Sequence, residues 1–209
     1  MLKTIIFDLG GVLIDLDKKA CIEAFRKLGF RDIDQYLGEY IQQGFFMDLE
    51  EGKISVQAYY KEVRRHCARP ELTEEEINRA WYRILDGLPV YKLDLLRELR
   101  KTYQVFALSN TNDIALSYFS TVLFTQQGLT IHDYFDRLFL SHQMGCAKPD
   151  AEIFKKMIRE SHIEPPEALF LDDAESNIAA ARTLGFQTYL VKPHEDFRQL
   201  FDELNTPEK

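Results

Sequence analysis

Five short apolar segments recur along the chain, and each has the length and composition of a buried strand. Their sequences are TIIFDL, QVFALSN, RLFLS, EALFLDD and QTYLVK. Helix-length stretches lie between them, at 90–102, 150–161 and 175–185, and apolar residues recur there at helical spacing. Nearly continuous apolar strands that alternate with helices are typical of a parallel sheet covered on both faces. The pattern predicts an α/β fold with a Rossmann-like parallel sheet.

Residues 16–88 follow a different pattern, because no strand-like segment occurs there. Helices are predicted at 18–30, which ends near Gly29, at 55–67 after an N-cap at Ser55, and at 73–85. The last of these begins with a capping-box pattern, a threonine followed three residues later by glutamate. We therefore predict a core domain formed by 1–15 and 89–209, and an all-helical cap domain at 16–88. A frayed tail is expected at 205–209.

The composition narrows the range of functions. The chain has 209 residues, the length of one domain with an insertion. Its net charge of −8 opposes general nucleic-acid binding, which needs a basic surface. No apolar run approaches the roughly 20 residues of a membrane span, and Asp8 interrupts the only stretch similar to a signal peptide. We expect a cytoplasmic protein with no nucleic-acid or membrane partner, and leave open whether it is a monomer or a dimer. The scattered cysteines, Cys21, Cys67 and Cys146, are expected to be free thiols.

Polar residues mark the ends of the predicted strands, where open parallel sheets bind their ligands. Taken singly, some have a structural explanation: Ser109 and Asn110 would cap the following helix, and Lys148 would be an ordinary loop lysine. The adjacent Asp172 and Asp173 are harder to explain, because neighbouring carboxylates at a sheet edge repel each other unless a cation lies between them. The complete set is Asp8, Ser109, Asn110, Lys148, Asp172, Asp173 and Asn177.

Together these residues support one kind of chemistry. Carboxylates from neighbouring strands suit a hard cation such as Mg²⁺. A hydroxyl group and backbone N–H groups at the start of a helix suit phosphate oxygens, and a lysine offsets the accumulated negative charge. A carboxylate that faces phosphorus can act as a nucleophile and form an aspartyl-phosphate. The sequence therefore predicts Mg²⁺-dependent hydrolysis of a small phosphate ester.

The segments FDLGGVL, LSN, KP and LDDAESN, in this order, resemble motifs one to four of the haloacid dehalogenase (HAD) superfamily. Residues 16–88 lie where that family carries its helical cap. The most similar subset comprises cap-bearing phosphatases, including sugar-phosphate phosphatases and the phosphatase domain of soluble epoxide hydrolase. The resemblance implies a HAD-like fold and phosphatase activity on a small phosphorylated metabolite.

The resemblance also implies how the motif residues divide between metal and nucleophile. Asp8 would be the nucleophile and a Mg²⁺ ligand. The backbone carbonyl of Gly10 and the carboxylate of Asp173 would be further ligands. Asp172 would lie beside the metal, either as a ligand or behind one.

The remaining motif residues would bind the phosphate group or hold the site in place. By the same resemblance, Ser109 and the amide of Asn110 would hold the phosphate. Lys148 would bridge the nucleophile and the phosphate. Asn177 would orient either its own loop or the ammonium group of Lys148.

Gly10 departs from the family pattern, because family phosphatases usually carry a second aspartate there. That acid protonates the leaving group and then activates water, a contribution of about 10²–10⁴-fold. Electrostatic stabilisation is usually the larger effect, so the glycine predicts a slower enzyme or an easy leaving group such as an anomeric sugar hydroxyl. Asp15 and Asp17 would substitute through water, or are simply solvated loop acids.

Two other functions remain open. Metal-independent 2-haloacid dehalogenases share the nucleophile, the Ser-Asn pair and the lysine, but they lack the acidic pair that Asp172 and Asp173 form here. A weakly active phosphatase fold that serves as a binding protein is the other alternative, and the joint presence of Asp8, Lys148 and Asp173 opposes it. The cap would select the substrate, and most of its aromatic residues are expected to form the cap's own core: Phe45, Phe46, Tyr59, Tyr60, Trp81 and Tyr82.

Overall fold

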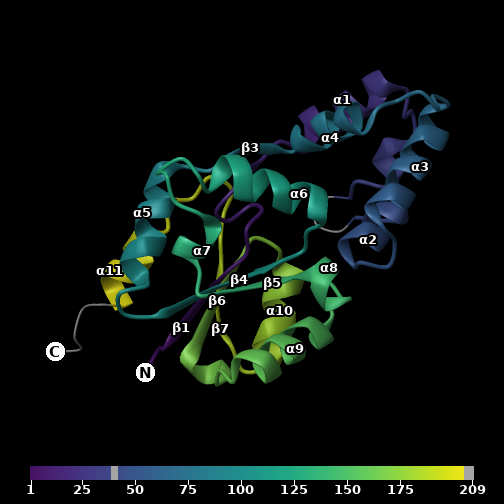
Figure 1. The fold of residues 1–209 in the computed structure, drawn as a ribbon. Helices are drawn as coiled ribbons and strands as arrows, with labels where there is room; N and C mark the ends of the chain where they lie inside the picture. The colour runs from purple at the N-terminus through teal and green to yellow at the C-terminus, as the bar shows by residue number, and fades with distance from the viewer. Residues whose placement is uncertain (39–41, 205–209) are drawn as a thin grey trace.

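The computed structural model describes residues 1–38 and 42–204, and its centre is a five-stranded sheet (Figure 1). The strand order is β5-β4-β1-β6-β7, and every neighbouring pair is parallel. The predicted α/β fold with a parallel sheet is confirmed. The predicted frayed tail, 205–209, lies outside the described residues. The five strands match the five apolar segments: β1 (Thr4–Phe7), β4 (Gln104–Ser109), β5 (Arg137–Leu140), β6 (Ala168–Asp172) and β7 (Gln187–Leu190).

Helices cover both faces of the sheet, because successive strand residues point to opposite sides. Phe7 of β1 belongs to the hydrophobic cluster of one face, together with residues of α5 and α11. Its neighbour Ile6 belongs to the cluster of the other face, which α9 and α10 complete. Both side chains are fully buried. The four helices are α5 (Val90–Leu99), α9 (Ala151–Ser161), α10 (Glu175–Thr183) and α11 (Arg198–Leu204).

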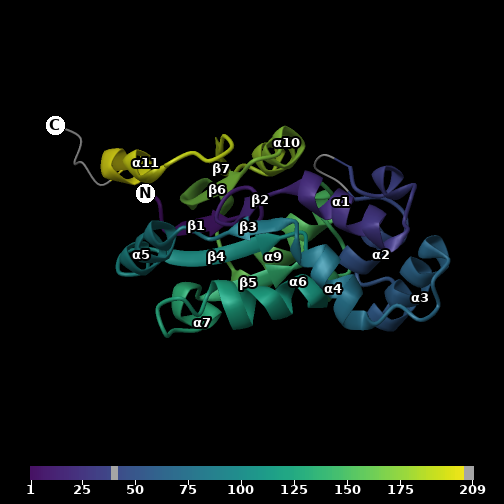
Figure 2. The same ribbon diagram turned by 90° about the horizontal axis from the view of Figure 1, so that it is seen from above.

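The inserted segment carries its own group of helices. In both views they lie together at one end of the molecule, away from the N-terminus (Figures 1 and 2). The predicted N-cap at Ser55 and the capping box of Thr73 and Glu76 are confirmed. Asp17 caps the first helix by accepting a hydrogen bond from the backbone of Ala20. The helices are α1 (Lys18–Leu28), α2 (Phe45–Glu50), α3 (Val56–Cys67) and α4 (Glu74–Tyr82), with a short 3₁₀ turn, η1 (Ile33–Gln35).

A short antiparallel ribbon joins this helical group to the sheet domain. It consists of β2 (Asp15–Leu16) and β3 (Leu85–Gly87), at the two ends of the predicted insert. The expectation that the segment 16–88 contains no strand is therefore wrong at its edges. Strands of two or three residues are too short to produce an alternating pattern, so sequence periodicity cannot reveal them. The division into domains at 15–16 and 88–89 falls beside this ribbon and stays a prediction.

Aromatic rings fill the interior of the helical group, as expected from the sequence. The rings of Phe46 and Trp81 are stacked with centroids 5.3 Å apart, and Phe25 meets Phe46 edge-on at 5.6 Å. Tyr59 is fully buried beside them. The three cysteines are free and buried, which confirms the predicted thiols. In the described part of the chain, no helix combines the length and apolar character that a membrane span requires.

Several short elements of the sheet domain had no clear sequence pattern. A π-helix, η2, continues directly from α6, and α8 is a single turn at the end of β5. α8 matters for the site, because it contacts α2 of the inserted segment. These additional elements are α6 (Asp113–Tyr118), η2 (Phe119–Leu123), α7 (Ile131–Tyr134), α8 (Ser141–Met144) and η3 (Pro165–Glu167).

Candidate active site

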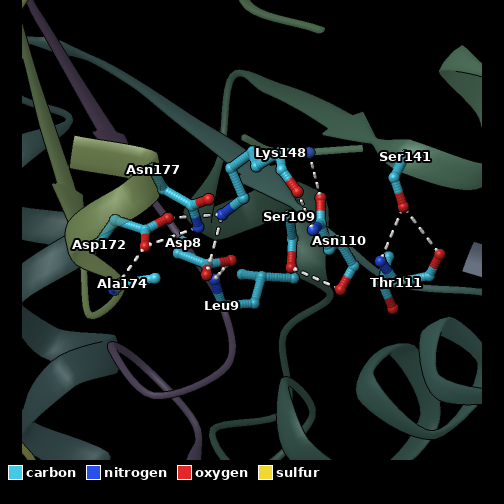
Figure 3. Close-up of polar contacts among 10 residues, drawn as sticks. All are labelled: Asp8, Leu9, Ser109, Asn110, Thr111, Ser141, Lys148, Asp172, Ala174 and Asn177. Atoms are coloured by element: carbon cyan, nitrogen blue, oxygen red, sulfur yellow. Dashed lines mark hydrogen bonds and ion pairs between the residues drawn. The ribbon is translucent and has the colours of Figure 1, made fainter. Parts of the chain in front are cut away.

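The carboxyl ends of the three central strands bring the predicted site residues together. Asp8 directly follows β1, and its backbone N–H donates to the carbonyl of Leu171 on β6 (2.9 Å). Asp172 is the last residue of β6, and Ser109 is the last residue of β4. Because β1 pairs with both neighbours in parallel, these side chains meet at one sheet edge (Figure 3). Lys148 reaches them from the loop between α8 and α9.

Lys148 lies between two carboxylates (Figure 3). Its Nζ is 2.9 Å from Oδ2 of Asp8 and 2.7 Å from Oδ2 of Asp172, and only 1% of its side chain is exposed. Burial acts to lower the pKa of Lys148, but Asp172 and Asp8 outweigh it and hold this pKa above its ordinary value. The lysine is therefore charged at neutral pH and faces the predicted nucleophile.

The carboxylate of Asp172 is occupied by protein donors. Oδ2 accepts from Lys148, while Oδ1 accepts from the backbone N–H of Ala174 and from Nδ2 of Asn177, both at 2.9 Å. The residue is fully buried. With both oxygens engaged, Asp172 is better suited to hold Lys148 than to bind a metal. Asn177 therefore acts on Lys148 through the carboxylate of Asp172.

The acidic residues suit a divalent cation. Asp8, Asp172 and Asp173 each present a carboxylate oxygen, and these oxygens lie within 4.8 Å of one another. Burial is the main cause that raises the pKa of Asp8 to about 7; Asp172 and Asp173 add to the rise, and Lys148 opposes it. Burial and the charge of Asp172 also raise the pKa of Asp173. Such crowding of carboxylates is relieved by a hard cation with oxygen ligands, so the residues present fit Mg²⁺.

The two adjacent glycines of the first motif differ in whether the structure requires a glycine. Gly11 adopts φ +74°, and a Cβ there would lie 2.2 Å from Oδ2 of Asp173. Only glycine allows this close approach of the backbone to a carboxylate. Gly10 has no left-handed φ, and its hypothetical Cβ would meet only Leu16, at 3.2 Å. The backbone therefore does not require glycine at the position of the missing acid.

Asn110 has a role that the sequence did not reveal. Its Oδ1 accepts from the backbone N–H of Lys148 (2.8 Å), and its Nδ2 donates to the carbonyl of Lys148 (2.9 Å) (Figure 3). The side chain thus fixes the lysine loop to the end of β4. Neither Ser109 nor Asn110 caps the next helix, because Asn112 caps α6 by accepting from Ile114 and Ala115. Binding of phosphate by Ser109 and the amide of Asn110 stays a prediction.

A cavity of about 120 Å³ joins these residues to the inserted segment. It is smaller than the roughly 300–1,000 Å³ typical of pockets for drug-sized ligands, which favours a small substrate. Asp8, Gly10, Ser109, Lys148 and Asp173 line it on the sheet side. The inserted segment contributes further lining residues: Lys18, Gln42, Glu50, Trp81, Ile84 and Leu85.

The sequence did not single out Glu50, an acid that lines this cavity. It is the last residue of α2 and only 9% exposed. Burial first, and the charge of Asp8 second, raise the pKa of Glu50 to about 8. Nothing in the sequence distinguishes it from an ordinary surface glutamate of a short helix. Asp15 and Asp17 do not line the cavity: Asp15 pairs with Lys92 (3.2 Å), and Asp17 caps α1.

Comparisons with known proteins agree with this site. Residues 2–185 match the model of the haloacid dehalogenase-like hydrolase family. A D-ribitol-5-phosphate phosphatase of Bacteroides thetaiotaomicron is 44% identical, over 95% of this chain and 96% of its own. A HAD family enzyme of the same bacterium, solved in complex with magnesium and inorganic phosphate, superposes with a TM-score of 0.91 at 39% identity, over 96% of this chain and 100% of that one. A shorter match, 40% identical over 62 residues, joins 30% of this chain to 11% of bifunctional epoxide hydrolase 2 of Sus scrofa.

The chain belongs to the family of haloacid dehalogenase-like hydrolases. The fold, the order of the motifs and the cluster of carboxylates at the sheet edge are those expected of its phosphatases. The predicted class of enzyme, a magnesium-dependent phosphatase, is thereby confirmed.

Proposed function

We propose that this phosphatase hydrolyses the phosphate monoester of a small polyol or sugar, and that D-ribitol 5-phosphate is the first substrate to test. The observation that carries the catalytic part is the buried Asp8 carboxylate held 2.9 Å from Lys148 and beside Asp173. The similarity to a D-ribitol-5-phosphate phosphatase over nearly the whole chain supports the substrate class.

Several residues that line the cavity carry unpaired polar atoms, which supports a hydroxyl-rich substrate. Nε1 of Trp81, Oε1 of Gln42, Oγ1 of Thr111 and Nδ2 of Asn112 are buried and have no hydrogen-bond partner within 1–38 and 42–204. Buried polar groups normally pair, because leaving them unpaired costs free energy. The hydroxyl groups of a polyol can both accept from the indole N–H and donate to the glutamine carbonyl. An apolar phosphate ester would leave all four groups unsatisfied.

The residues divide the reaction between them as follows. An oxygen of the Asp8 carboxylate attacks phosphorus, the bond to the alcohol oxygen breaks, and an aspartyl-phosphate forms. Lys148 stays between the carboxylate and the phosphate and offsets their charges. Ser109 and the backbone amide of Asn110 hold the phosphate oxygens. Asp8, Asp173 and the carbonyl of Gly10 would hold Mg²⁺, which would supply further positive charge. Water then hydrolyses the aspartyl-phosphate, which releases inorganic phosphate and restores Asp8.

Release of inorganic phosphate by the purified protein tests this function. We expect turnover of D-ribitol 5-phosphate with Mg²⁺, and its loss with EDTA, in Asp8→Asn and in Asp173→Ala. Asp34→Asn, an exposed surface substitution in the cap, serves as the control and keeps the activity. Full activity of Asp173→Ala without metal, or chloride release from a 2-haloacid, would favour the dehalogenase alternative. Equal turnover of apolar alkyl phosphates would contradict the polyol assignment.

A further inference from the structure

A buried glutamate of the cap segment lines the cavity of the nucleophile. Glu50 lines the cavity together with Asp8 and Gly10. Four charged groups act on it: Asp8 and Lys148 from the sheet edge, Lys18 from α1, and its neighbour Glu51. Burial is the largest cause that raises the pKa of Glu50, and this favours the protonated acid. Its place in the cavity suits a group that gives a proton to a leaving oxygen.

Contacts with the sheet domain fix the position of Glu50. Oγ of Ser141 lies 2.5 Å from the carbonyl oxygen of Glu50 and 3.0 Å from that of Thr111, and it accepts from the N–H of Thr111 (2.9 Å). Thr111 directly follows the predicted phosphate-binding pair. At Gly52 (φ +66°), a Cβ would lie 2.2 Å from the carbonyl oxygen of His142. The turn after Glu50 therefore packs directly on α8, and these contacts hold the acid at a fixed position relative to Thr111.

Other acids near the site already have different roles. Among the described residues that line the cavity, the carboxylic acids are Asp8, Asp173 and Glu50. Asp8 is the nucleophile, and Asp173 is assigned to the metal. Asp15 and Asp17 are bound to Lys92 and to the start of α1. Glu50 is the acid of the cavity that remains for proton transfer.

We propose that Glu50 is the general acid and base of this phosphatase and takes the place of the acid that is absent at Gly10. This proposal rests on the proposed function. As the bond between phosphorus and the alcohol oxygen breaks, its electron pair stays on the oxygen, and Glu50 gives that oxygen a proton. The Glu50 carboxylate then takes a proton from water as the water oxygen attacks the aspartyl-phosphate, which releases Asp8 and inorganic phosphate.

The leaving group provides the test. Glu50→Gln keeps the size of the side chain but removes the acid, and Glu75→Gln makes the same change at an exposed cap position as the control. We would measure kcat/KM for D-ribitol 5-phosphate, whose alkoxide needs a proton, and for p-nitrophenyl phosphate, whose phenolate does not. For Glu50→Gln we expect a loss of about 10²–10⁴-fold on the alkyl ester and less than about tenfold on the aryl ester. Glu50→Asp should recover part of the loss.

The outcomes separate this proposal from the function on which it rests. Equal losses on both esters, or no loss on the alkyl ester, would overturn the role of Glu50 while the phosphatase function stands. Absence of Mg²⁺-dependent activity in the unmodified protein would overturn both. If Glu50→Gln does not fold, a series of esters with the unmodified protein decides: general acid catalysis predicts a kcat/KM that depends only weakly on the pKa of the leaving alcohol. A steep dependence on that pKa would contradict it.

Discussion

The ammonium group of Lys148 lies 2.7 Å from the carboxylate of Asp172, and both side chains are almost completely buried. The remaining partners of this carboxylate are the backbone N–H of Ala174, at the N-cap of α10, and the side-chain amide of Asn177, in the first turn of α10. Asp172 thus anchors the lysine beside Asp8, the proposed nucleophile. Catalysis by a charged group depends on such positioning, because an electrostatic contribution is largest when the group is already in place.

Removal of Lys148 should affect turnover far more than substrate binding. We expect Lys148→Ala to lower kcat by about 10²–10³-fold, the range found for loss of one preorganised electrostatic donor. Asp172→Asn should also lower kcat, because Lys148 loses the carboxylate that holds it in place. Steady-state kinetics and thermal melting would be measured together, with Lys101→Ala at an exposed position as the control. A Lys148→Ala enzyme within tenfold of the unmodified rate would show that the lysine has no catalytic part.

Binding of Mg²⁺ should depend on pH. In the metal-free protein the pKa of Asp8 is raised to about 7, so the carboxylate keeps its proton at lower pH and the metal must displace it. We expect the Kd for Mg²⁺ to rise as pH falls below 7, by up to about tenfold per pH unit, with proton release on binding. Calorimetry at pH 6 and pH 8 in buffers of different ionisation enthalpy measures both. A Kd that is the same at both pH values would contradict this assignment.

The same shift affects stability without metal. The folded pKa of Asp8 exceeds its ordinary value of 3.8, so the folded protein binds the proton more strongly than the unfolded chain does. The resulting stabilisation is complete below about pH 4 and is lost as pH rises through 7. Between pH 6 and pH 8, the metal-free protein should therefore lose stability, and Mg²⁺ should restore more of it at pH 8. Asp8→Asn, which cannot ionise, should show a smaller difference between the two pH values.

The local sequence pattern predicted the sheet and most of the polar residues at its edge. Asp8, Ser109 and Asp172 each end an apolar strand, and the ends of parallel strands meet at one edge. Glu50 could not be recognised in this way, because it enters the cavity only through the packing of α2 on α8. The hydrogen bond from the Asn110 side chain to the backbone of Lys148 likewise joins residues that are distant in sequence. Such contacts depend on tertiary structure, and neither periodicity nor motif spacing records them.

Gly11 offers a test of the metal site that does not alter any ligand. Its Cβ would collide with Asp173, and its φ of +74° also disfavours alanine. Gly128 has a similar φ of +72° but no atom within 4 Å of its hypothetical Cβ, so it is a matched control for backbone strain. Both alanine variants should lose about 1–2 kcal/mol of stability from the left-handed conformation. Only Gly11→Ala should also weaken Mg²⁺ binding, and equal affinities in the two variants would place Asp173 outside the metal site.

Gly10→Asp tests directly whether an acid at residue 10 increases the rate. The backbone at Gly10 accepts a side chain, and the first contact, 3.2 Å from a Leu16 methyl group, involves a partly exposed side chain that can rotate. The new carboxyl group would lie in the cavity near the leaving oxygen. If Glu50 already supplies the proton, the substitution should change kcat/KM for D-ribitol 5-phosphate by less than about tenfold, well short of the usual 10²–10⁴-fold contribution of an acid.

Gly10→Asp combined with Glu50→Gln tests whether one acid can replace the other. In a Glu50→Gln background, Gly10→Asp should restore much of the activity on the alkyl phosphate and change the aryl phosphate little, because one acid replaces the other. The double-mutant cycle would then show strong non-additivity, as expected for two groups that perform the same step. Pre-steady-state measurement of the first turnover isolates alcohol release from the hydrolysis of aspartyl-phosphate that all substrates share. The opposite outcome is that Gly10→Asp raises the activity on poor leaving groups as strongly in the unmodified enzyme as in the Glu50→Gln background. That result would show that the unmodified enzyme has no acid at this step and that Glu50 is not the proton donor.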